Sequence, residues 1–301
     1  MRSTLRPLLG IIVAGGLVLA ACGSDDDEGG DTTAAETTAA GGDTTAAGGG
    51  GETKDCQPIN DGVLTVVTSL PGPNFWGTQA AEVDPDSIQS GIEFDLANKI
   101  AEACGLEMEF RNEVFDAIVA GQVAEDSYDI ALSQVTITDE RAEVVDFSVP
   151  YFKADQGLLV PTGTEASTWD DVKAMNLGVQ ASTTAEFYFQ EIPEWKLDSD
   201  PQSFPDLTSA YEALASGQVD GVVIDTPINL GQAAQSNGEL EVVAQFSTGE
   251  EYGAIYPKGS PKKAVFDEII QGFVDDGTVN ELIAQYLGGD PSTVPFIEVG
   301  S

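Results

Sequence analysis

One arginine in this chain stands where it could bind a carboxylate. Arg141 follows the hydroxyl-bearing Thr136 by five positions and precedes an apolar run. Arginine is scarce here, with four in the whole chain against 51 acidic residues. A guanidinium grips a carboxylate through two parallel hydrogen bonds, and a neighbouring hydroxyl can complete the cradle. The pattern therefore indicates an anion-binding position; the alternative is a surface Arg141 paired with Glu140 or Glu143.

Composition excludes several classes of function. The formal net charge is −39 and there is no histidine. A field of that sign repels phosphate backbones, so nucleic acid is not an expected partner. Without histidine, Ser-His-Asp and Cys-His nucleophilic chemistry is absent. Three cysteines are too few for a thiolate metal cage, and we predict neither a metal site nor a cofactor.

The elements that must position Arg141 alternate between strands and helices. Apolar, β-branched runs predict strands at about 62–68, 107–110, 129–132, 157–160, 177–179, 221–225, 240–244 and 254–256. Helices are predicted at about 95–104, 206–216, 226–234, 261–273 and 278–287, with others starting near 115 and 184. Alternation of this kind predicts α/β layers with largely parallel sheets, in which ligands sit at the carboxyl ends of strands. Loops 68–76, 133–138 and 180–184, together with Asp225, all follow strands and predict one shared cleft.

The N-terminus indicates export and anchoring. Residues 1–21 have the basic, apolar and small-residue order of a signal peptide. Residues 19–22 (Leu-Ala-Ala-Cys) resemble the bacterial lipobox, which implies cleavage before Cys22 and lipid attachment to it; the alternative is an ordinary signal peptide with an incidental cysteine. Residues 22–55 are rich in Gly, Ala, Thr and Asp and predict a flexible tether.

The two other cysteines can meet. Cys56 lies just before the first predicted strand, and Cys104 ends the helix that follows it. A helix that returns antiparallel to its strand brings these positions together, so a disulfide is plausible in an oxidising compartment. The alternative is two buried free thiols.

Several motifs in a fixed order resemble one family. They lie at 91–97 (GIEFDLA), 128–131 (YDIA), 136–141 (TITDER), 145–148 (VDFS), 220–227 (DGVVIDTP), 252–260 (YGAIYPKGS) and 276–282 (DGTVNEL). Together, over most of residues 61–288, they resemble the family 3 extracellular solute-binding proteins, the polar amino-acid receptors of bacterial ABC importers. The resemblance implies a two-lobed periplasmic-binding-protein type II fold with two hinge crossings. Lobe 1 would comprise residues 56–152 plus 252–301, and lobe 2 residues 153–251.

The resemblance also implies roles for individual residues. Arg141, helped by Thr136, matches the family position that holds the ligand α-carboxylate, and Thr184 matches a further carboxylate contact. Asp225 matches the acid that accepts the α-ammonium; the local alternative is a cap for the helix that starts at Thr226. Gln134 falls where the family uses backbone groups for the ammonium.

Three other positions concern the ligand side chain. Phe115 matches an aromatic that lines it, although alone it would more often be a core residue. In the first loop, Phe75 or Trp76 is expected to contact the ligand, the alternative being that both pack the loop. Ser69 stands where binders of cationic side chains often carry an acid, and no second arginine is placed for an acidic side chain. A neutral polar amino acid is therefore preferred.

The leading hypothesis is a lipid-anchored, monomeric amino-acid receptor on the outer face of the cytoplasmic membrane, with an ABC permease as its partner. It would not be an enzyme. Two alternatives remain: an enzyme on the same scaffold, because arogenate and prephenate dehydratases resemble this family, and a chemosensory protein that docks to a receptor after binding its ligand.

Overall fold

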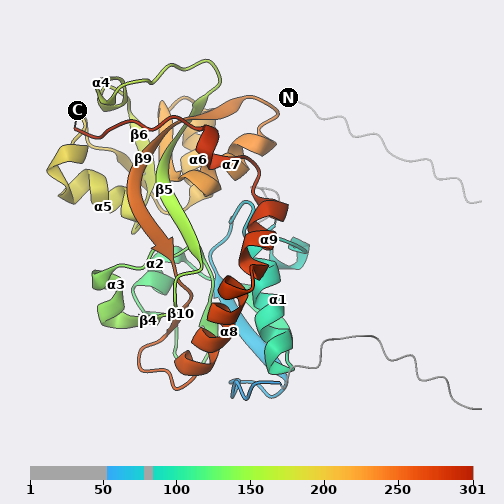
Figure 1. Cartoon of the computed structure of the whole chain (residues 1–301). Helices are drawn as coiled ribbons and strands as arrows, with labels where there is room; N and C mark the ends of the chain where they lie inside the picture. Colours follow the sequence, from blue (N-terminus) through green and yellow to red (C-terminus); the bar gives the residue numbers. More distant parts are fainter. Residues whose placement is uncertain (1–52, 78–83, 301) are drawn as a thin grey trace, which may run out of the picture. The chain divides into compact units, whose positions relative to one another are not determined.

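A computed structural model of the chain describes residues 53–77 and 84–300. The predicted signal segment, Cys22 and nearly all of the tether lie outside the described residues. Within the described part, strands and helices alternate and form two five-stranded sheets, as the α/β prediction required. The two sheets belong to the lower and upper lobes in Figure 1.

The first sheet belongs to lobe 1. Its strand order is β2-β1-β3-β10-β4. Strand β1 pairs in parallel with β2 and β3, whereas β10 is antiparallel to β3 and β4. Its strands are β1 (Val63–Thr68), β2 (Glu107–Asn112), β3 (Ile130–Ala131), β4 (Val145–Phe147) and β10 (Ile255–Pro257), and the helices of this lobe are η1 (Pro85–Ser87), α1 (Ile92–Cys104), α2 (Phe115–Val119), α3 (Asp139–Val144), α8 (Lys263–Asp275) and α9 (Thr278–Tyr286).

The second sheet belongs to lobe 2 and has the order β7-β6-β8-β5-β9. Strand β6 is parallel to β7 and β8, and β5 is antiparallel to β8 and β9. Its strands are β5 (Phe152–Pro161), β6 (Leu177–Gln180), β7 (Gln202–Phe204), β8 (Gly221–Asp225) and β9 (Leu240–Tyr252), and its helices are α4 (Trp169–Lys173), α5 (Thr184–Glu191), η2 (Pro193–Trp195), α6 (Leu207–Ala215), α7 (Thr226–Gln235) and η3 (Pro291–Thr293).

Two long strands carry the chain between the lobes. β5 and β9 pair from Phe152 opposite Tyr252 to the far end of lobe 2, and Figure 1 shows them running from the lower lobe into the upper one. The pairing shifts register beside Asp155, whose Oδ1 accepts the backbone N–H groups of Thr248 (2.7 Å) and Gly249 (3.0 Å). Gly249 has φ of 65°, which favours glycine. The crossing is therefore a bulged ribbon rather than a flat one.

The C-terminal segment packs differently from our prediction. The family resemblance places residues 252–301 in lobe 1, but Gln245 of β9 donates its backbone N–H to Pro295 O (2.8 Å) and its carbonyl accepts from Ile297 N (2.9 Å). Its side-chain Nε2 also donates to Val294 O at 2.9 Å. The segment after α9 thus returns to lobe 2. The segment packs there because Ile297 is buried in the hydrophobic core of lobe 2.

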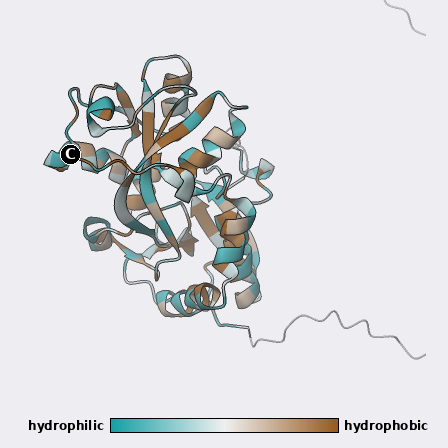
Figure 2. Ribbon diagram, turned by 45° about the horizontal axis from the view of Figure 1, so that its top comes forward, coloured by the Kyte–Doolittle hydropathy of each residue, from teal (hydrophilic) through white to brown (hydrophobic). Residues whose placement is uncertain are grey.

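Glycines and apolar periodicity explain the position of α1. Leu96 and Ile100 recur at helical spacing and are fully buried. Gly91 precedes the helix with φ of 141°, and a Cβ there would lie 2.3 Å from Phe75 O. Gly105 ends the helix in the left-handed conformation and donates to backbone carbonyls of the last turn. Figure 2 shows hydrophobic residues on strands of both lobes and helices that alternate between hydrophobic and hydrophilic residues.

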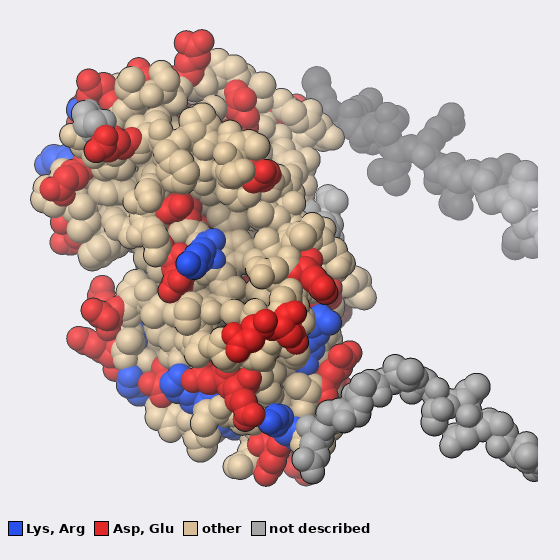
Figure 3. Space-filling model, in the orientation of Figure 1, with Lys and Arg blue, Asp and Glu red and all other residues tan. Residues whose placement is uncertain are grey.

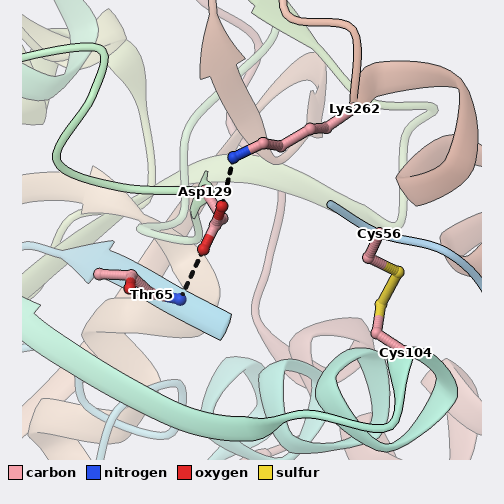
Figure 4. The surroundings of a disulfide bond; sticks show 5 residues. All are labelled: Cys56, Thr65, Cys104, Asp129 and Lys262. Carbon is pink, nitrogen blue, oxygen red and sulfur yellow. Dashed lines mark hydrogen bonds and ion pairs between the residues drawn. A yellow bond between two sulfur atoms is a disulfide. The ribbon is translucent and has the colours of Figure 1, made fainter. Parts of the chain in front are cut away.

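The entry of the chain into the first sheet is fixed by covalent and ionic contacts. Cys56 and Cys104 form a disulfide with their Cα atoms 5.6 Å apart, as the helix-return prediction proposed. Close to it, Asp129 is fully buried, accepts Thr65 N at 2.9 Å and forms an ion pair with Lys262 (Figure 4). These contacts join β1, the segment before β3 and the segment before α8. None of the helices in the described ranges is both long and apolar enough to cross a membrane.

Candidate ligand-binding site

A cavity lies between the lobes, where strand ends of the two sheets face each other. It is lined by Ser69, Leu70, Pro71, Phe115, Ser133, Gln134, Thr136, Arg141, Gln180, Thr183, Thr184, Leu207, Ile224, Asp225 and Ile228. Seven of the nine predicted ligand-binding residues are in this set; the other two, Phe75 and Trp76, are not. The surface in Figure 3 is hollowed between the two lobes at the left of the view. Convergence of strand ends on one cleft is the arrangement that α/β sheets use for ligands.

Arg141 enters the cavity from lobe 1. It lies in the short helix α3, which Thr138 caps by accepting Arg141 N at 3.2 Å. Its Nη1 donates to Thr136 O and its Nη2 to Ser182 O, both at 2.8 Å, and the guanidinium carbon lies 5.7 Å from the centre of the Phe115 ring. Three of the five guanidinium hydrogens remain for other acceptors. The guanidinium is directed inward rather than toward the surface pairing that was the alternative.

Arg141 is buried close to three acidic residues. Burial lowers the pKa of its guanidinium, and the negative charges of Asp225, Glu250 and Glu140 oppose that shift. The group nevertheless stays protonated, because an arginine pKa lies far above neutral pH. It is therefore a permanent cation that faces the carboxylates of Asp225 and Glu250.

Asp225 enters from lobe 2 at the end of β8. It is 4% exposed, and its side chain makes no capping hydrogen bond to α7, contrary to the alternative role. Its two oxygens accept from Gln156 Nε2 and from Tyr252 Oη, each at 2.5 Å. Burial raises the pKa of Asp225 to about 7, Glu250 reinforces the shift, and Tyr252, Gln156 and Arg141 oppose it.

Charge on the cavity wall is balanced. Of the lining residues in the described part of the chain, only Arg141 and Asp225 are charged. One comes from each lobe. The remaining lining side chains are hydroxyls, amides and apolar groups, including Ser69 and Phe115. Such a wall suits a small molecule that carries one negative and one positive group, since a buried charge without a partner is costly.

Gln134 is held in an unusual backbone conformation by a buried acid. Its φ is 49°, outside the region that non-glycine residues prefer. Glu93, fully buried, accepts Gln134 N at 2.8 Å and Gln134 Nε2 at 2.5 Å. It also accepts from Tyr151 Oη (2.5 Å) and Trp76 Nε1 (2.8 Å). Burial raises the pKa of Glu93, and these four donors act against the shift.

The hydroxyls on the wall come from both lobes. Ser69 is fixed through its backbone N–H, which donates to Ser133 Oγ at 2.9 Å. Thr136 contributes through its position before α3, where its carbonyl receives Arg141. Thr184 is the first residue of α5, and its Oγ1 lies 3.3 Å from Gln156 Nε2. These groups surround the charged pair with neutral donors and acceptors.

Phe75 and Trp76 do not line the cavity, so the prediction of a ligand contact by one of them does not fit the structure. Both are fully buried in the core of lobe 1. The backbone turns back at Gly72, where Trp76 N donates to Gly72 O at 2.7 Å, and this turn directs both rings inward. Phe75 packs edge-on against Phe152, with ring centroids 5.2 Å apart, at the hinge. We therefore assign both to packing.

Contacts across the cleft hold the lobes together. Ser182 Oγ donates to Asp116 Oδ1 at 2.6 Å, and Ser182 O receives Arg141 Nη2. On another side, Asn74 Nδ2 donates to Pro227 O at 3.3 Å. Ser182 has φ of 63°, which turns its carbonyl and side chain toward lobe 1. The structure is thus in a closed arrangement.

The structure adds three buried residues that sequence reasoning missed. Gln156, Glu250 and Glu93 are all at least 95% buried. Gln156 donates to the predicted site residue Asp225, Glu93 accepts from the predicted site residue Gln134, and Glu250 accepts from Gln156. Gln156 stands directly before an apolar strand run, and Glu93 lies on the buried face of the first helix; either position could have drawn attention as a polar residue on an apolar face. Glu250 carried no such signal. In the described residues no group of His, Cys, Asp and Glu is arranged to hold a metal ion.

Comparison with known proteins defines the class. Residues 79–289 match the bacterial extracellular solute-binding proteins, family 3, and the chain belongs to this family. It is 29% identical over 209 residues to the L-cystine-binding protein TcyJ of Escherichia coli K12, covering 68% of this chain and 77% of that protein. It is 30% identical to a probable histidine-binding protein of Neisseria gonorrhoeae, covering 65% and 74%.

Solved structures agree with the fold. An ancestral arginine-binding protein bound to glutamine aligns with a TM-score of 0.65 at 29% identity, covering 76% of this chain and 99% of that one. The relatives named here differ in the side chain of the amino acid in their names. Membership of the family therefore leaves the side-chain preference of this chain open.

Proposed function

We propose that this protein is a lipid-anchored receptor that binds a neutral polar amino acid between its lobes and delivers it to an ABC importer. The observation that carries the proposal is the charge balance of the cavity wall, with Arg141 from one lobe facing Asp225 from the other. Arg141 would hold the α-carboxylate, with Thr136 and Thr184 completing the cradle. Asp225 would accept the α-ammonium, together with the backbone around Gln134.

The side-chain preference follows from what surrounds that pair. A third charge on the ligand would find no opposite charge on the described wall, and its desolvation would be uncompensated. Phe115, Leu70 and Ile228 offer apolar contact, while Ser69 and Gln180 offer hydrogen bonds. A ligand side chain with an amide or hydroxyl satisfies both kinds of surface. The names of the relatives support an amino acid as the ligand class.

A binding screen tests the ligand. Thermal-shift measurements with the twenty common amino acids, followed by calorimetry on those that stabilise the protein, should select neutral polar members. Matched analogues that lack either the carboxylate or the ammonium should bind at least about 100-fold more weakly, because each leaves one buried charge unpaired. Stabilisation by no amino acid would refute the receptor proposal, and preference for a cationic or acidic amino acid would refute the side-chain assignment.

Separate experiments test anchoring, transport and the absence of catalysis. Cys22→Ser should move the protein from the membrane fraction to the soluble fraction without changing its affinity for amino acids. Deleting the cognate permease should abolish uptake; uptake unchanged alongside lost chemotaxis would favour a chemosensory role. Mass spectrometry of prephenate or arogenate incubated with the protein should show no product, whereas turnover would favour the dehydratase alternative.

A further inference from the structure

One amide nitrogen joins two buried acids behind the cavity. Gln156 Nε2 lies 2.5 Å from Asp225 Oδ1 and 2.7 Å from Glu250 Oε2. The two carboxylate oxygens are therefore within about 5 Å of each other. Asp225 is 4% and Glu250 5% exposed, and Gln156 is fully buried. Only Asp225 lines the cavity, so Glu250 acts on it from behind.

The hydrogen bonding of this group is incomplete. An amide nitrogen has two hydrogens, and both are used by the two acids. Thr248 Oγ1 donates to Glu250 Oε2 at 2.8 Å, but Glu250 Oε1 and Gln156 Oε1 have no partner within the described residues. An additional proton on one of the carboxylates would give these unpaired buried oxygens a hydrogen-bond donor.

Electrostatic repulsion also favours a proton on the two acids. Two carboxylates that share a buried site do not both ionise readily, because each repels the charge on the other. Arg141 is the cation whose charge acts on Asp225, and it can offset only one of the two negative charges. The ligand-free cleft is neutral only if the two acids together retain one proton.

Other ionisable side chains of the described residues face the two acids from several elements. Tyr252 of β9, Tyr211 of α6 and Tyr188 of α5 face the acids, and burial raises the pKa of each, for Tyr188 to about 12. Asp155 of β5 acts on Tyr188 from the hinge, and Glu93 of α1 acts on Tyr252 from lobe 1. Asp155 is held by the amides of the β9 bulge rather than by Gln156.

We propose that Asp225 and Glu250, bridged by Gln156, share one proton in the ligand-free cleft, and that the ammonium group of an arriving amino acid expels it. The inference rests on the proposed function, since it needs a cationic group beside Asp225. Binding then follows a balanced exchange: the protonated protein and the zwitterion give the complex and one proton released to the buffer. Glu250 is a positioning residue in this scheme, because it acts through Asp225 and does not touch the ligand.

The expected effect is a loss of affinity in acid. The protonated acid pair must lose its proton before Asp225 can hold an ammonium, so affinity is full above the pKa of Asp225 and falls below it. With that pKa raised to about 7, the affinity should be about tenfold weaker at pH 6 than at pH 8. In Glu250→Gln, the repelling charge is gone while burial remains, so the same change of pH should weaken binding only about twofold.

Calorimetry with L-glutamine is the test, because glutamine does not titrate between pH 6 and pH 8. Titrations in two buffers of different ionisation enthalpy measure the protons released per ligand bound. For wild type, the number of protons released per ligand bound should rise toward one as pH falls from 8 to 6. Glu251→Gln is the matched control: it removes the same charge from the adjacent residue, whose side chain pairs at the surface with Lys153, and it should behave as wild type.

The outcomes separate the inference from the proposed function. Binding of equal strength at both pH values, or a Glu250→Gln variant that keeps the tenfold dependence, would overturn the shared proton while leaving the receptor intact. If glutamine does not bind, that result counts against the proposed ligand class. Infrared difference spectra of the ligand-free protein then decide the inference: a protonated-carboxyl band present at pH 6, lost at pH 8 and diminished at pH 6 in Glu250→Gln supports it, and its absence from wild type refutes it.

Discussion

Replacing Arg141 by alanine should remove most amino-acid binding while leaving the fold intact. The substitution deletes the cation of the cavity wall and its hydrogen bonds to Thr136 O and Ser182 O. A ligand carboxylate entering the closed cleft would then be buried without its partner, which costs about 2–5 kcal/mol. This range corresponds to an affinity roughly 30- to several thousand-fold weaker. The upper part is expected, because the variant also loses the contact that joins the lobes through Ser182.

Arg111→Ala is the matched control for this measurement. Arg111 lies in β2, outside the cavity, where it pairs with Glu113 at 3.0 Å and donates to Ser127 O at 2.7 Å. Arg111→Ala changes the net charge of the protein by the same amount as Arg141→Ala, but it removes no side chain from the cavity. Calorimetry with the best amino acid from the screen should show a large loss for Arg141→Ala and less than about threefold for Arg111→Ala. Equal affinities in the two variants would refute the carboxylate assignment.

Other substitutions address the remaining contacts. Asp225→Asn should weaken binding of an amino acid far more than binding of its deaminated analogue in competition calorimetry; equal losses would make Asp225 structural. Asp116→Ala removes the acceptor of Ser182 Oγ across the cleft mouth, so stopped-flow fluorescence should show dissociation about fivefold faster with association little changed. In wild type, Trp76 Nε1 and Gln134 Nε2 donate to the Glu93 carboxylate. Glu93→Gln places an amide NH₂ against these donors, so denaturant titration should show a free energy of unfolding lower by about 1–3 kcal/mol. Because burial raises the pKa of Glu93, the stability of wild type should fall as pH rises through that pKa. The amide introduced by Glu93→Gln does not titrate, so the stability of this variant should depend less on pH.

The order of strands and helices was sufficient to locate most of the cavity. Predicted strand ends placed Thr136, Thr184 and Asp225 at one level, and all three line the cavity. This worked because side chains at the carboxyl ends of strands converge wherever the sheet forms, whatever its detailed packing. The same logic brought Cys56 and Cys104 together.

Features that depend on side-chain direction could not be predicted in this way. Phe75 and Trp76 follow the same strand as Ser69, but the turn at Gly72 sends their rings into the core. The contact of Gln156 with Glu250 spans 94 positions and forms only because β5 and β9 pair through the hinge. Sequence spacing carries no information about which face of a bulged ribbon a residue occupies.

The interleaving of the chain has a consequence for how the protein is made. Strand β10 lies between β3 and β4 in the first sheet, so Ile255 is the residue that joins Ala131 to Phe147. Until that strand is available for pairing, β3 and β4 have an open gap between them, and their unpaired edges can be captured by other chains. Assembly of the first lobe must therefore wait until the second has been synthesised. We expect late, slow folding dominated by pairings between distant segments.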